Sequence, residues 1–445
     1  MAQQLNKIWM LAGAVFLGAT SIIFPGFVQT SVSLPKQSQQ PSPHPSASPS
    51  ASPFKVERAP SKTDSLKALI DEVWQVVERS YVDGTFNQKD WKAIRTRYLS
   101  RNYNSPEEAY RAIDEMLKLL GDPLTRFMSP LAFKNMQIDT SSNVVGVGLR
   151  LQKDEKTQKI NIVAPIEDGP AWKAGVLAGD TLTKIDRQKA EGIDVNAAVT
   201  LLQGAPATFV TLTLLRDGKP LEFRIQRAKV EIHPVRYQTQ ETAIGRIGYI
   251  RFTQFSASAT SEMKMAIETL EAQNVEGYML DLRSNQGGLL YAAVEIIRLW
   301  LPKGLIFTTS GRSEVDRETA NNRALTSKPL VLLVDGESAS ATEIMAAALQ
   351  ENQRAVLVGT RTRGNNSIQS VRSLKDGSGL AVTVAKWLTP KERDINKVGI
   401  EPDVIVKLTD VQRRKLITHR DIGTLADPQY AKALEALRQK IGTVR

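Results

Sequence analysis

The sequence predicts a multidomain α/β protein with a helical N-terminal region, a smaller central domain over residues 144–228 and a larger α/β core with a mixed sheet. Three observations support this prediction. The chain has 445 residues, which is enough for two or three domains. Residues 64–135 repeat apolar side chains at helical spacing. Residues 229–410 alternate apolar, strand-like runs with helical stretches, a pattern typical of α/β folds.

The composition is that of an ordinary globular protein, with 42% hydrophobic and 24% charged residues. The net charge of +11 would suit an anionic partner, but the basic residues are scattered and form no long block or nucleic-acid motif. We therefore expect no nucleic-acid partner, and interpret the charge as an aid to solubility and to attraction by an anionic membrane surface. The absence of cysteine excludes disulfides and thiolate chemistry.

The first 63 residues predict export and no folded domain. Ile8 to Val28 carries no charge and follows Lys7, so residues 1–30 fit either a signal peptide or a membrane anchor formed by residues 8–28. Residues 31–63 are rich in proline, serine and glutamine, a composition that predicts an extended linker without a core.

Residues 64–140 are predicted to form the helical region. An apolar stripe with helical spacing runs through its first part: Leu66, Leu69, Ile70, Val73, Trp74, Val77 and Tyr81. Another helix is expected to begin at Ser105-Pro106-Glu107-Glu108, which combines a capping box with proline at the first helical position, and to end at Gly121. We expect the stripe to form a core and not a ligand site.

A serine-rich turn between a strand and a helix is the first candidate for chemistry. Leu330 to Val334 is an apolar run typical of a buried strand, and Glu343 to Gln350 is rich in helix-forming residues. Between them lies Ser338-Ala339-Ser340-Ala341-Thr342. Backbone N–H groups and the helix dipole favour negative charge at such a turn, as an attacking serine and its oxyanion require. An ordinary N-cap has the same composition, so these residues alone leave both interpretations open.

This stretch resembles the carboxyl-terminal processing peptidases, which are serine enzymes with a Ser-Lys dyad and an S-A-S-A-S-E-I motif. The motif reads SASATEI in this chain, and Ser340 occupies the position of the nucleophile. The family's T-F-G-K-G-x-V-Q motif, whose lysine is the general base, corresponds to Thr362–Gln369. Asn365 stands at the lysine position, Asn366 at that of the following glycine and Arg363 at that of the aromatic residue.

The resemblance implies further site residues. The family's D-L-R-x-N-x-G-G motif ends in Gly287 and Gly288, and one of their amides would form the oxyanion hole with the amide of Ala341. Glu351, eleven residues after Ser340, lies where related enzymes have an acidic residue that supports the site. A tight turn and a surface charge are the simpler explanations of the glycine pair and of the glutamate. The implied chemistry needs neither a metal nor another cofactor.

Residues 144–228 resemble a PDZ domain. Gly146-Val147-Gly148-Leu149 fits the loop whose backbone amides hold the terminal carboxylate of a peptide. Asp194 to Gln203 is expected to form the helix beside the groove, where a ligand would add as an extra strand. A PDZ domain that serves only as a scaffold is the alternative. The complete loop favours binding of C-terminal peptide segments of exported or membrane proteins.

Further motifs extend the resemblance from about Asp64 to Val406. GDPLTRFMSP at Gly121–Pro130 matches the family's helical region, and GLAVTVAKWLTP and DINKVGIEP match its closing strands. The helical region is most similar to that of the cyanobacterial and chloroplast branch, which implies a location in the periplasm or a thylakoid lumen. Residues 229–410 are thus interpreted as a serine-peptidase-like core, and residues 411–445 as a charged, helical C-terminal tail without a readable function.

The missing lysine divides the functional hypothesis in two. A serine hydroxyl needs a base, and neither asparagine nor the permanently protonated Arg363 can take its proton. The three histidines, His44, His233 and His419, lack the context of a triad base. Lys386 lies on a predicted strand where the family carries a lysine in addition to the catalytic one. One hypothesis is an endopeptidase with a rearranged base that cleaves exported or membrane proteins near their C-termini. The other is a catalytically impaired pseudopeptidase that binds C-termini as an adaptor.

Overall fold

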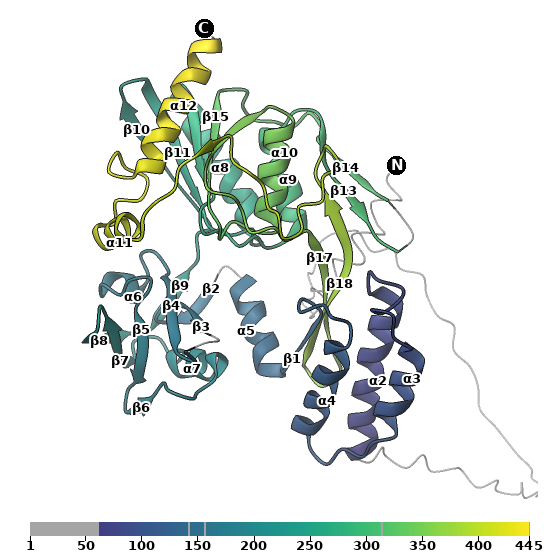
Figure 1. The fold of residues 1–445 in the computed structure, drawn as a ribbon. Coiled ribbons are helices and arrows are strands. Elements are labelled where there is room, and N and C mark those ends of the chain that lie inside the picture. The colour runs from purple at the N-terminus through teal and green to yellow at the C-terminus, as the bar shows by residue number, and fades with distance from the viewer. Residues whose placement is uncertain (1–61, 141–142, 155–156, 313–314, 445) are drawn as a thin grey trace, which may run out of the picture.

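A computed structural model of the protein describes residues 62–140, 143–154, 157–312 and 315–444. The predicted signal or anchor segment and nearly all of the linker lie outside these residues. Figure 1 shows a large α/β core at the top, the helical region at the lower right and the central domain at the lower left. The predicted mixed α/β fold class is confirmed. Among the described residues, none of the helices combines the length and the apolarity needed to cross a membrane.

The helical region forms a core of its own around the predicted apolar stripe. Ile70, Val73 and Val77 of the stripe are buried there, together with Ile113 and Met116 from a later helix. Ser105 caps that helix as predicted, because its hydroxyl accepts a hydrogen bond from the N–H of Glu108. The elements of the region are α2 (Lys62–Ser80), α3 (Trp91–Leu99), α4 (Pro106–Lys118), β1 (Arg126–Met128) and α5 (Pro130–Thr140).

The central domain is a five-stranded antiparallel sheet with two helices and a short extra strand. The strand order is β3-β4-β5-β7-β8, so β3 lies at an edge of the sheet, and α7 contacts β3. A separate two-stranded ladder of β2 and β9 lies where the chain enters and leaves the domain. The elements are β2 (Asn143–Gly146), β3 (Leu149–Lys153), β4 (Ile160–Pro165), α6 (Pro170–Lys173), β5 (Thr181–Ile185), β6 (Gln188–Lys189), α7 (Val195–Leu202), β7 (Phe209–Arg216), β8 (Lys219–Gln226) and β9 (Ala228–Glu231).

The core is built on a mixed six-stranded sheet of order β10-β11-β12-β15-β16-β19, in which only the β10–β11 pair is antiparallel. Successive side chains point to opposite faces, so Leu330, Leu332 and Val334 pack under α8, α9 and α10, whereas Val331 and Leu333 face the other way. The elements are β10 (Val235–Thr242), β11 (Gly245–Phe252), α8 (Ala259–Ala272), β12 (Gly277–Asp281), α9 (Leu290–Trp300), β15 (Leu330–Val334), α10 (Ala341–Glu351), β16 (Ala355–Gly359) and β19 (Val404–Ile405).

The C-terminal residues are helical, as expected, but they pack on the core instead of forming a separate tail. They form α11 (Asp410–His419) and α12 (Pro428–Val444), and α12 covers the second face of the core sheet (Figure 1). Its buried side chains, Tyr430, Ala433, Leu437 and Ile441, recur at helical spacing. The last helix is therefore a layer of the core, and the charges occupy its outer side.

A second sheet joins the core to the helical region. Its long hairpin consists of β17 (Ser367–Ser373) and β18 (Gly379–Leu388), and it also contains β1, β13 (Leu305–Ser310) and β14 (Arg317–Thr319). Leu374, Leu380 and Val382 from the hairpin belong to the helical region's apolar core. The hairpin begins directly after Asn366, so the helical region supports the segment that carries the expected base position.

Candidate active site

Ser340 lies between the buried strand β15 and helix α10, as the sequence predicts. It is the N-cap of α10, and its backbone adopts φ 55° and ψ −117°. A positive φ is costly for a residue with a side chain and persists only where the surroundings hold it. Part of this support is the carboxylate of Glu343, which accepts a hydrogen bond of 2.9 Å from the Ser340 N–H. The serine is thus held in a strained turn at a helix N-terminus.

The glycine loop lies directly against this turn. A Cβ atom added to Gly287 would lie 2.8 Å from the Ala339 oxygen and 2.9 Å from the Ala341 nitrogen, so no larger residue fits there. The N–H of Gly287 donates to Asn285 Oδ1 at 2.9 Å. The amides of Gly288 and Ala341 have no acceptor within the described part of the chain. Of the two glycines, Gly288 therefore has the amide that remains available to a ligand.

One buried carboxylate connects the serine turn to the loop that carries Asn365. Glu343 is fully buried, and besides Ser340 it accepts hydrogen bonds from the Thr362 hydroxyl at 2.5 Å, the Gly364 N–H at 2.7 Å and the Asn365 N–H at 2.9 Å. Four donors thus surround its two oxygens and replace the water lost on burial. The sequence reasoning missed this role, although Ser340 and Glu343 have the spacing of a capping box.

The side chains at the base position supply no proton acceptor of the required kind. Asn365 Oδ1 accepts the N–H of Ser367 at 3.1 Å and closes a local turn. Asn366 is buried, donates to Asp394 Oδ1 at 2.9 Å and leaves its own Oδ1 without a partner among the described residues. Arg363 forms an ion pair with Glu337. The loop is therefore ordered, but it carries no amine.

The structure does not bring Glu351 to Ser340. The two residues lie at opposite ends of α10, about 16 Å apart along the helix at the usual rise of 1.5 Å per residue. Glu351 accepts hydrogen bonds from the Arg393 guanidinium and from the Lys391 N–H. Its contacts are those of a carboxylate that fixes a peripheral loop, which differs from the supporting role inferred from the family.

The other titratable side chains that we considered as a base for Ser340 do not contact it either. Lys386 is exposed on β18 and lies opposite Ser367 in the strand register. His233 lies near the carboxylates of Glu231 and Glu262, at 3.9 Å and 3.7 Å, at the junction between the central domain and the core. His419 is exposed at the end of α11. None of these groups forms a hydrogen bond with Ser340 in the described structure.

The Gly146–Leu149 segment forms a fixed loop at the start of β3. The Val147 and Gly148 carbonyls accept hydrogen bonds of 2.9 Å from Ala171 and Ile166, respectively. The amides of Val147 and Gly148 have no acceptor among the residues described. Gly148 has φ 73°, a conformation that favours glycine. The loop thus has the free, clustered N–H groups that an anion requires.

A groove leads from this loop along β3. The free edge of β3 lies beside α7, which spans Val195–Leu202 and therefore matches the helix predicted over Asp194–Gln203. The Asp194 side chain caps the helix by accepting the N–H of Asn196. An unpaired strand edge beside a helix is the geometry in which a peptide adds as a further strand.

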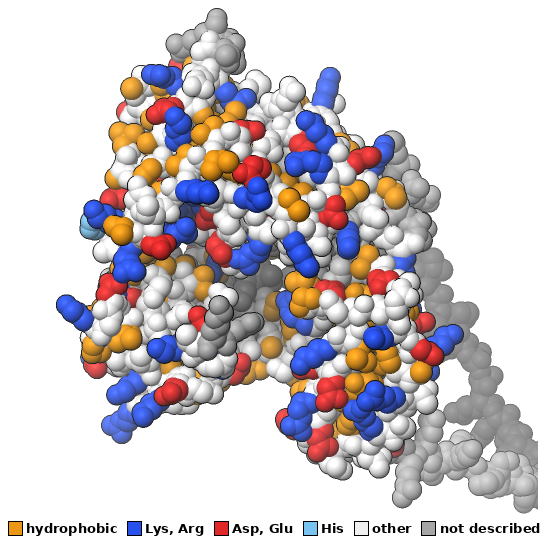
Figure 2. All heavy atoms as spheres, in the orientation of Figure 1, with side chains coloured by type: hydrophobic (Ala, Val, Ile, Leu, Met, Phe, Trp, Pro, Cys, Tyr) orange, Lys and Arg blue, Asp and Glu red, His pale blue; other side chains and the backbone are white. Residues whose placement is uncertain are grey.

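A single cleft of about 1000 Å³ connects this groove with the glycine loop of the core. Its wall includes Gly146–Leu149, Gly287 and Gly288, and it also includes Leu416 and Ile417 of α11. Figure 2 shows that the surface is hollowed where the central domain meets the core. The contribution of α11 was not foreseen, because the sequence of the C-terminal segment gave no functional signal.

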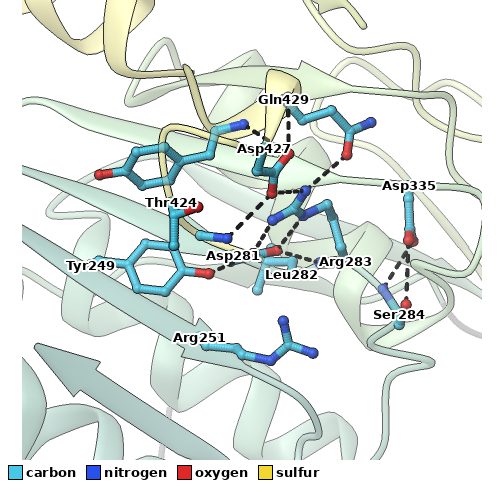
Figure 3. A network of polar contacts seen from close by, with 12 residues as sticks. Tyr249, Arg251, Asp281, Leu282, Arg283, Ser284, Asp335, Thr424, Asp427 and Gln429 are labelled. Atoms are coloured by element: carbon cyan, nitrogen blue, oxygen red, sulfur yellow. Dashed lines mark hydrogen bonds and ion pairs between the residues drawn. The ribbon is translucent and has the colours of Figure 1, made fainter. Parts of the chain in front are cut away.

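A buried ionic network fixes the start of the glycine loop (Figure 3). Arg283 forms ion pairs with Asp281 at 2.5 Å and with Asp427 at 2.8 Å, and Tyr249 donates to Asp281 at 2.8 Å. Burial opposes ionisation of Asp281, but the positive charge of Arg283 more than offsets it, so the pKa of this carboxyl lies below its usual value. Asp427 also caps α12 by accepting the Tyr430 N–H, so the network ties the loop to the last helix.

Fold and site together define a protein of the serine-peptidase type with an attached PDZ domain. The sequence profile of peptidase family S41 matches residues 246–406, and that of the PDZ domain matches residues 162–216. The central domain is therefore a PDZ domain, as the resemblance implied.

Sequence similarity to several named proteins covers most of the chain. A carboxyl-terminal-processing protease of Synechocystis sp. is 41% identical over 84% of this chain and 87% of its own length. The chloroplastic carboxyl-terminal-processing peptidase 3 of Arabidopsis thaliana is 37% identical over 79% of this chain and 70% of its own. The solved structure of a photosystem II D1 C-terminal processing protease is 34% identical, covers 82% of this chain and 99% of that one, and gives a TM-score of 0.63. The chain belongs to peptidase family S41, and these relatives are carboxyl-terminal-processing proteases of cyanobacteria and chloroplasts.

Proposed function

We propose that this protein binds the C-terminal segments of exported or membrane proteins through its PDZ domain and holds them at a Ser340 site that has lost its general base. The observation that carries the proposal is Asn365, which occupies the base position with its side chain engaged in a local turn. The recognition loop and the strained serine turn are both retained around it. The protein is a serine-type peptidase by family, and its hydrolytic rate is expected to be strongly reduced.

Peptide binding is supported by the arrangement of the PDZ domain. The free amides of Val147 and Gly148 suit a terminal carboxylate, and the open edge of β3 suits the backbone of the preceding residues. The cleft continues from this groove to Gly287 and Gly288, and Gly287 lies directly against the Ser340 turn. C-terminal peptide segments are accordingly the partners that we assign to the protein.

Reduced hydrolysis is supported by the chemistry of the base loop. Glu343 is the carboxylate nearest to Ser340 by its hydrogen bonds, but both of its oxygens already accept hydrogen bonds from four donors in the turn and the loop. Loss of a serine protease's base lowers turnover by about 10⁶ and leaves roughly 10³ to 10⁴ over water from binding and the oxyanion hole. In this proposal Gly288 and Ala341 supply that oxyanion hole.

A working endopeptidase is the second candidate, and the retained architecture favours it. The Ser340 turn, the glycine loop and the Glu343 network form a complete scaffold for acyl transfer. Relatives that are 41% and 37% identical are named as processing proteases. This candidate requires a base from elsewhere in the chain or from the substrate.

We place the protein outside the cytosol, in the periplasm or a thylakoid lumen, with residues 8–28 as signal peptide or anchor. The uncharged Ile8–Val28 segment and the cyanobacterial and chloroplast relatives support this assignment. Fractionation with external protease tests it. Recovery of the full-length protein from the cytosolic fraction would contradict export.

One experiment separates the two candidates. A fluorescent peptide with an apolar C-terminus is incubated with the wild type and with Ser340→Ala, and both binding and cleavage are measured. We expect both proteins to bind the peptide equally, amidation of its C-terminus to weaken binding at least tenfold, and neither protein to cleave it efficiently. Efficient wild-type cleavage that Ser340→Ala abolishes would establish the endopeptidase instead.

A further inference from the structure

Arg251 is a cation in the cleft that the proposed mechanism does not use. It lies near the end of β11, next to Asp281 in the strand register, and it lines the cleft together with Ser284 and Gly288. In Figure 3 its guanidinium lies beside the ionic network and extends towards the side on which Ser284 lies, without a bond to the residues drawn. Arg283, in contrast, is fully engaged by Asp281 and Asp427.

The guanidinium of Arg251 has an incomplete set of partners. Its contact is with Glu167 of the PDZ domain, where Nε lies 3.1 Å from Oε1, but the alignment forms no hydrogen bond and the buried Nε remains unpaired. Glu167 also pairs with Arg236, which has Asp168 as a second partner. A planar guanidinium with unused N–H groups beside an open cleft is suited to bidentate binding of a carboxylate.

The position of Arg251 indicates which part of a peptide it would meet. Arg251 is four residues before Phe255, which bridges to Gly288, so an extended backbone places it at most about 13 Å from the glycine loop. On the other side, Glu167 and the Arg150–Gln254 hydrogen bond connect the same segment to the PDZ domain. A tail with its C-terminus in the PDZ loop would therefore pass Arg251 at most about four residues beyond the bond held at Ser340.

We propose that Arg251 binds a carboxylate of the peptide in the cleft, and that it selects tails with an acidic residue within about four positions C-terminal to the Ser340 site. This inference rests on the proposed binding of C-terminal tails. The α-carboxylate of a shorter tail has the same chemistry and could meet the same guanidinium. In either case Arg251 binds a negative charge between the two ends of the cleft, and the PDZ loop binds the C-terminus of the peptide.

The test is a position scan by fluorescence anisotropy with the full-length protein. Each peptide ends in the same apolar residues and carries a single Glu or Gln at successive positions upstream. We expect one position at which the Glu peptide binds about tenfold more tightly than its Gln counterpart. Arg251→Gln should remove this preference, and Arg251→Lys should retain part of it.

Arg236→Gln is the matched control, because Arg236 shares Glu167 with Arg251 but does not line the cleft. It should leave the Glu preference unchanged. An equal loss in both variants would overturn the inference, since the effect would then come from the junction between the domains. Tight binding of free-ended tails without any Glu preference would overturn it too.

Two further outcomes tell an acidic side chain from the α-carboxylate as the group bound, and test the proposed function itself. If Arg251→Gln removes the preference for a free over an amidated terminus, Arg251 holds the α-carboxylate, which supports carboxylate binding but rejects selection of an acidic side chain. If free and amidated tails bind equally to the wild type at every position, the proposed function fails, and the inference about Arg251 fails with it.

Discussion

The nucleophile turn (residues 338–343) and the base loop (residues 362–367) make an instructive pair, because one carboxylate holds both. Glu343 accepts the Ser340 N–H from the first segment and the Gly364 and Asn365 N–H groups from the second. The first segment keeps its strained serine and a free helix-terminal amide. The second keeps its hydrogen bonds but has an amide side chain in place of an amine.

The difference between the two segments indicates that the position of the loop and the reactivity of its side chain at residue 365 are determined separately. Backbone N–H groups position the base loop, so an Asn365 side chain can replace lysine without loss of the contacts to Glu343. In the function that we propose, the asparagine stands where the family's general base is expected and cannot take a proton. On this proposal, the loop stays ordered through its backbone hydrogen bonds without supplying a base.

The largest expected effect comes from restoring the base. The triple variant Arg363→Phe, Asn365→Lys and Asn366→Gly should raise Ser340-dependent peptide cleavage by several orders of magnitude, because the serine turn and oxyanion donors are already in place. It also removes the Arg363–Glu337 ion pair and the unpaired Asn366 oxygen. Single-turnover cleavage of a tail peptide is the measurement.

Asn365→Lys alone should restore less, because Arg363 stays in the loop as a fixed positive charge that helps to keep the lysine deprotonated but adds repulsion and bulk. The triple variant with Ser340→Ala is the control and should be inactive. A triple variant no faster than the wild type would show that the site lacks more than its base.

The second expected effect concerns the shared carboxylate. Glu343→Gln places an N–H₂ group among four donors, which should lower the free energy of unfolding by about 2–3 kcal/mol. In the base-restored background it should also slow cleavage, because the two segments lose their common support. Urea unfolding and cleavage rates measure the two effects.

Glu351→Gln is the control at the other end of the same helix. It weakens the contacts with Arg393, so it should reduce stability but leave the cleavage rate of the base-restored protein unchanged. A loss of cleavage as large as that of Glu343→Gln would show that Glu351 supports the active site, as the family resemblance implied.

A smaller effect is expected at the recognition loop. Gly148→Ala forces a side chain into φ 73°, which should cost about 1–2 kcal/mol and weaken binding of a free C-terminal peptide about tenfold. Gly175→Ala carries a similar strain at φ 89° in open space, away from the loop. Isothermal titration should find wild-type affinity for this control, and equal weakening in both variants would argue against the loop as the anion site.

The smallest effect is a pH dependence of stability that comes from Asp281. The pKa of Asp281 lies below the usual value of an aspartate, since the charge of Arg283 outweighs the effect of burial. The pair therefore adds stability above the unfolded pKa, and this stability is lost as the pH falls through the lower folded pKa. Urea midpoints should fall progressively as the pH drops from about 5 to about 2.

Asp281→Asn should be less stable at neutral pH but should lose less over the same pH range. Asp71→Asn is the matched control, because Asp71 pairs with the partly exposed Arg95 and such pairs contribute only about 0.2–1 kcal/mol. An unchanged pH slope in Asp281→Asn would show that other carboxylates dominate the acid loss.

Much of the architecture could be predicted because the signals are local. The N-cap at Ser105, the glycine pair at Gly287 and the apolar run of β15 each specify their own conformation. The family resemblance supplied the domain order. The position of Ser340 at a strand-to-helix turn followed from the sequence, and the structure places it there.

What escaped prediction depends on contacts between distant segments. Glu343 resembles any N3 glutamate until Thr362 and Gly364 are brought to it. The apolar positions of α12 are diluted by charges, so only its packing on the core sheet identifies it as a layer of the fold. The sequence does not distinguish Arg251 from the other arginines, because only the structure shows which guanidinium lacks hydrogen-bond partners.

The hairpin that joins the core to the helical region has a consequence for how the chain folds. The Thr125 hydroxyl accepts a hydrogen bond from the Thr383 N–H, 258 residues later in the sequence, and the first helices bury their apolar faces against Leu380 and Val382. The apolar core of the helices that are synthesised first is therefore complete only after the last third of the chain has been made. Such non-local closure slows folding and prolongs exposure of apolar surface. A chain delivered across a membrane from its N-terminus would thus depend on protection of these helices during transit.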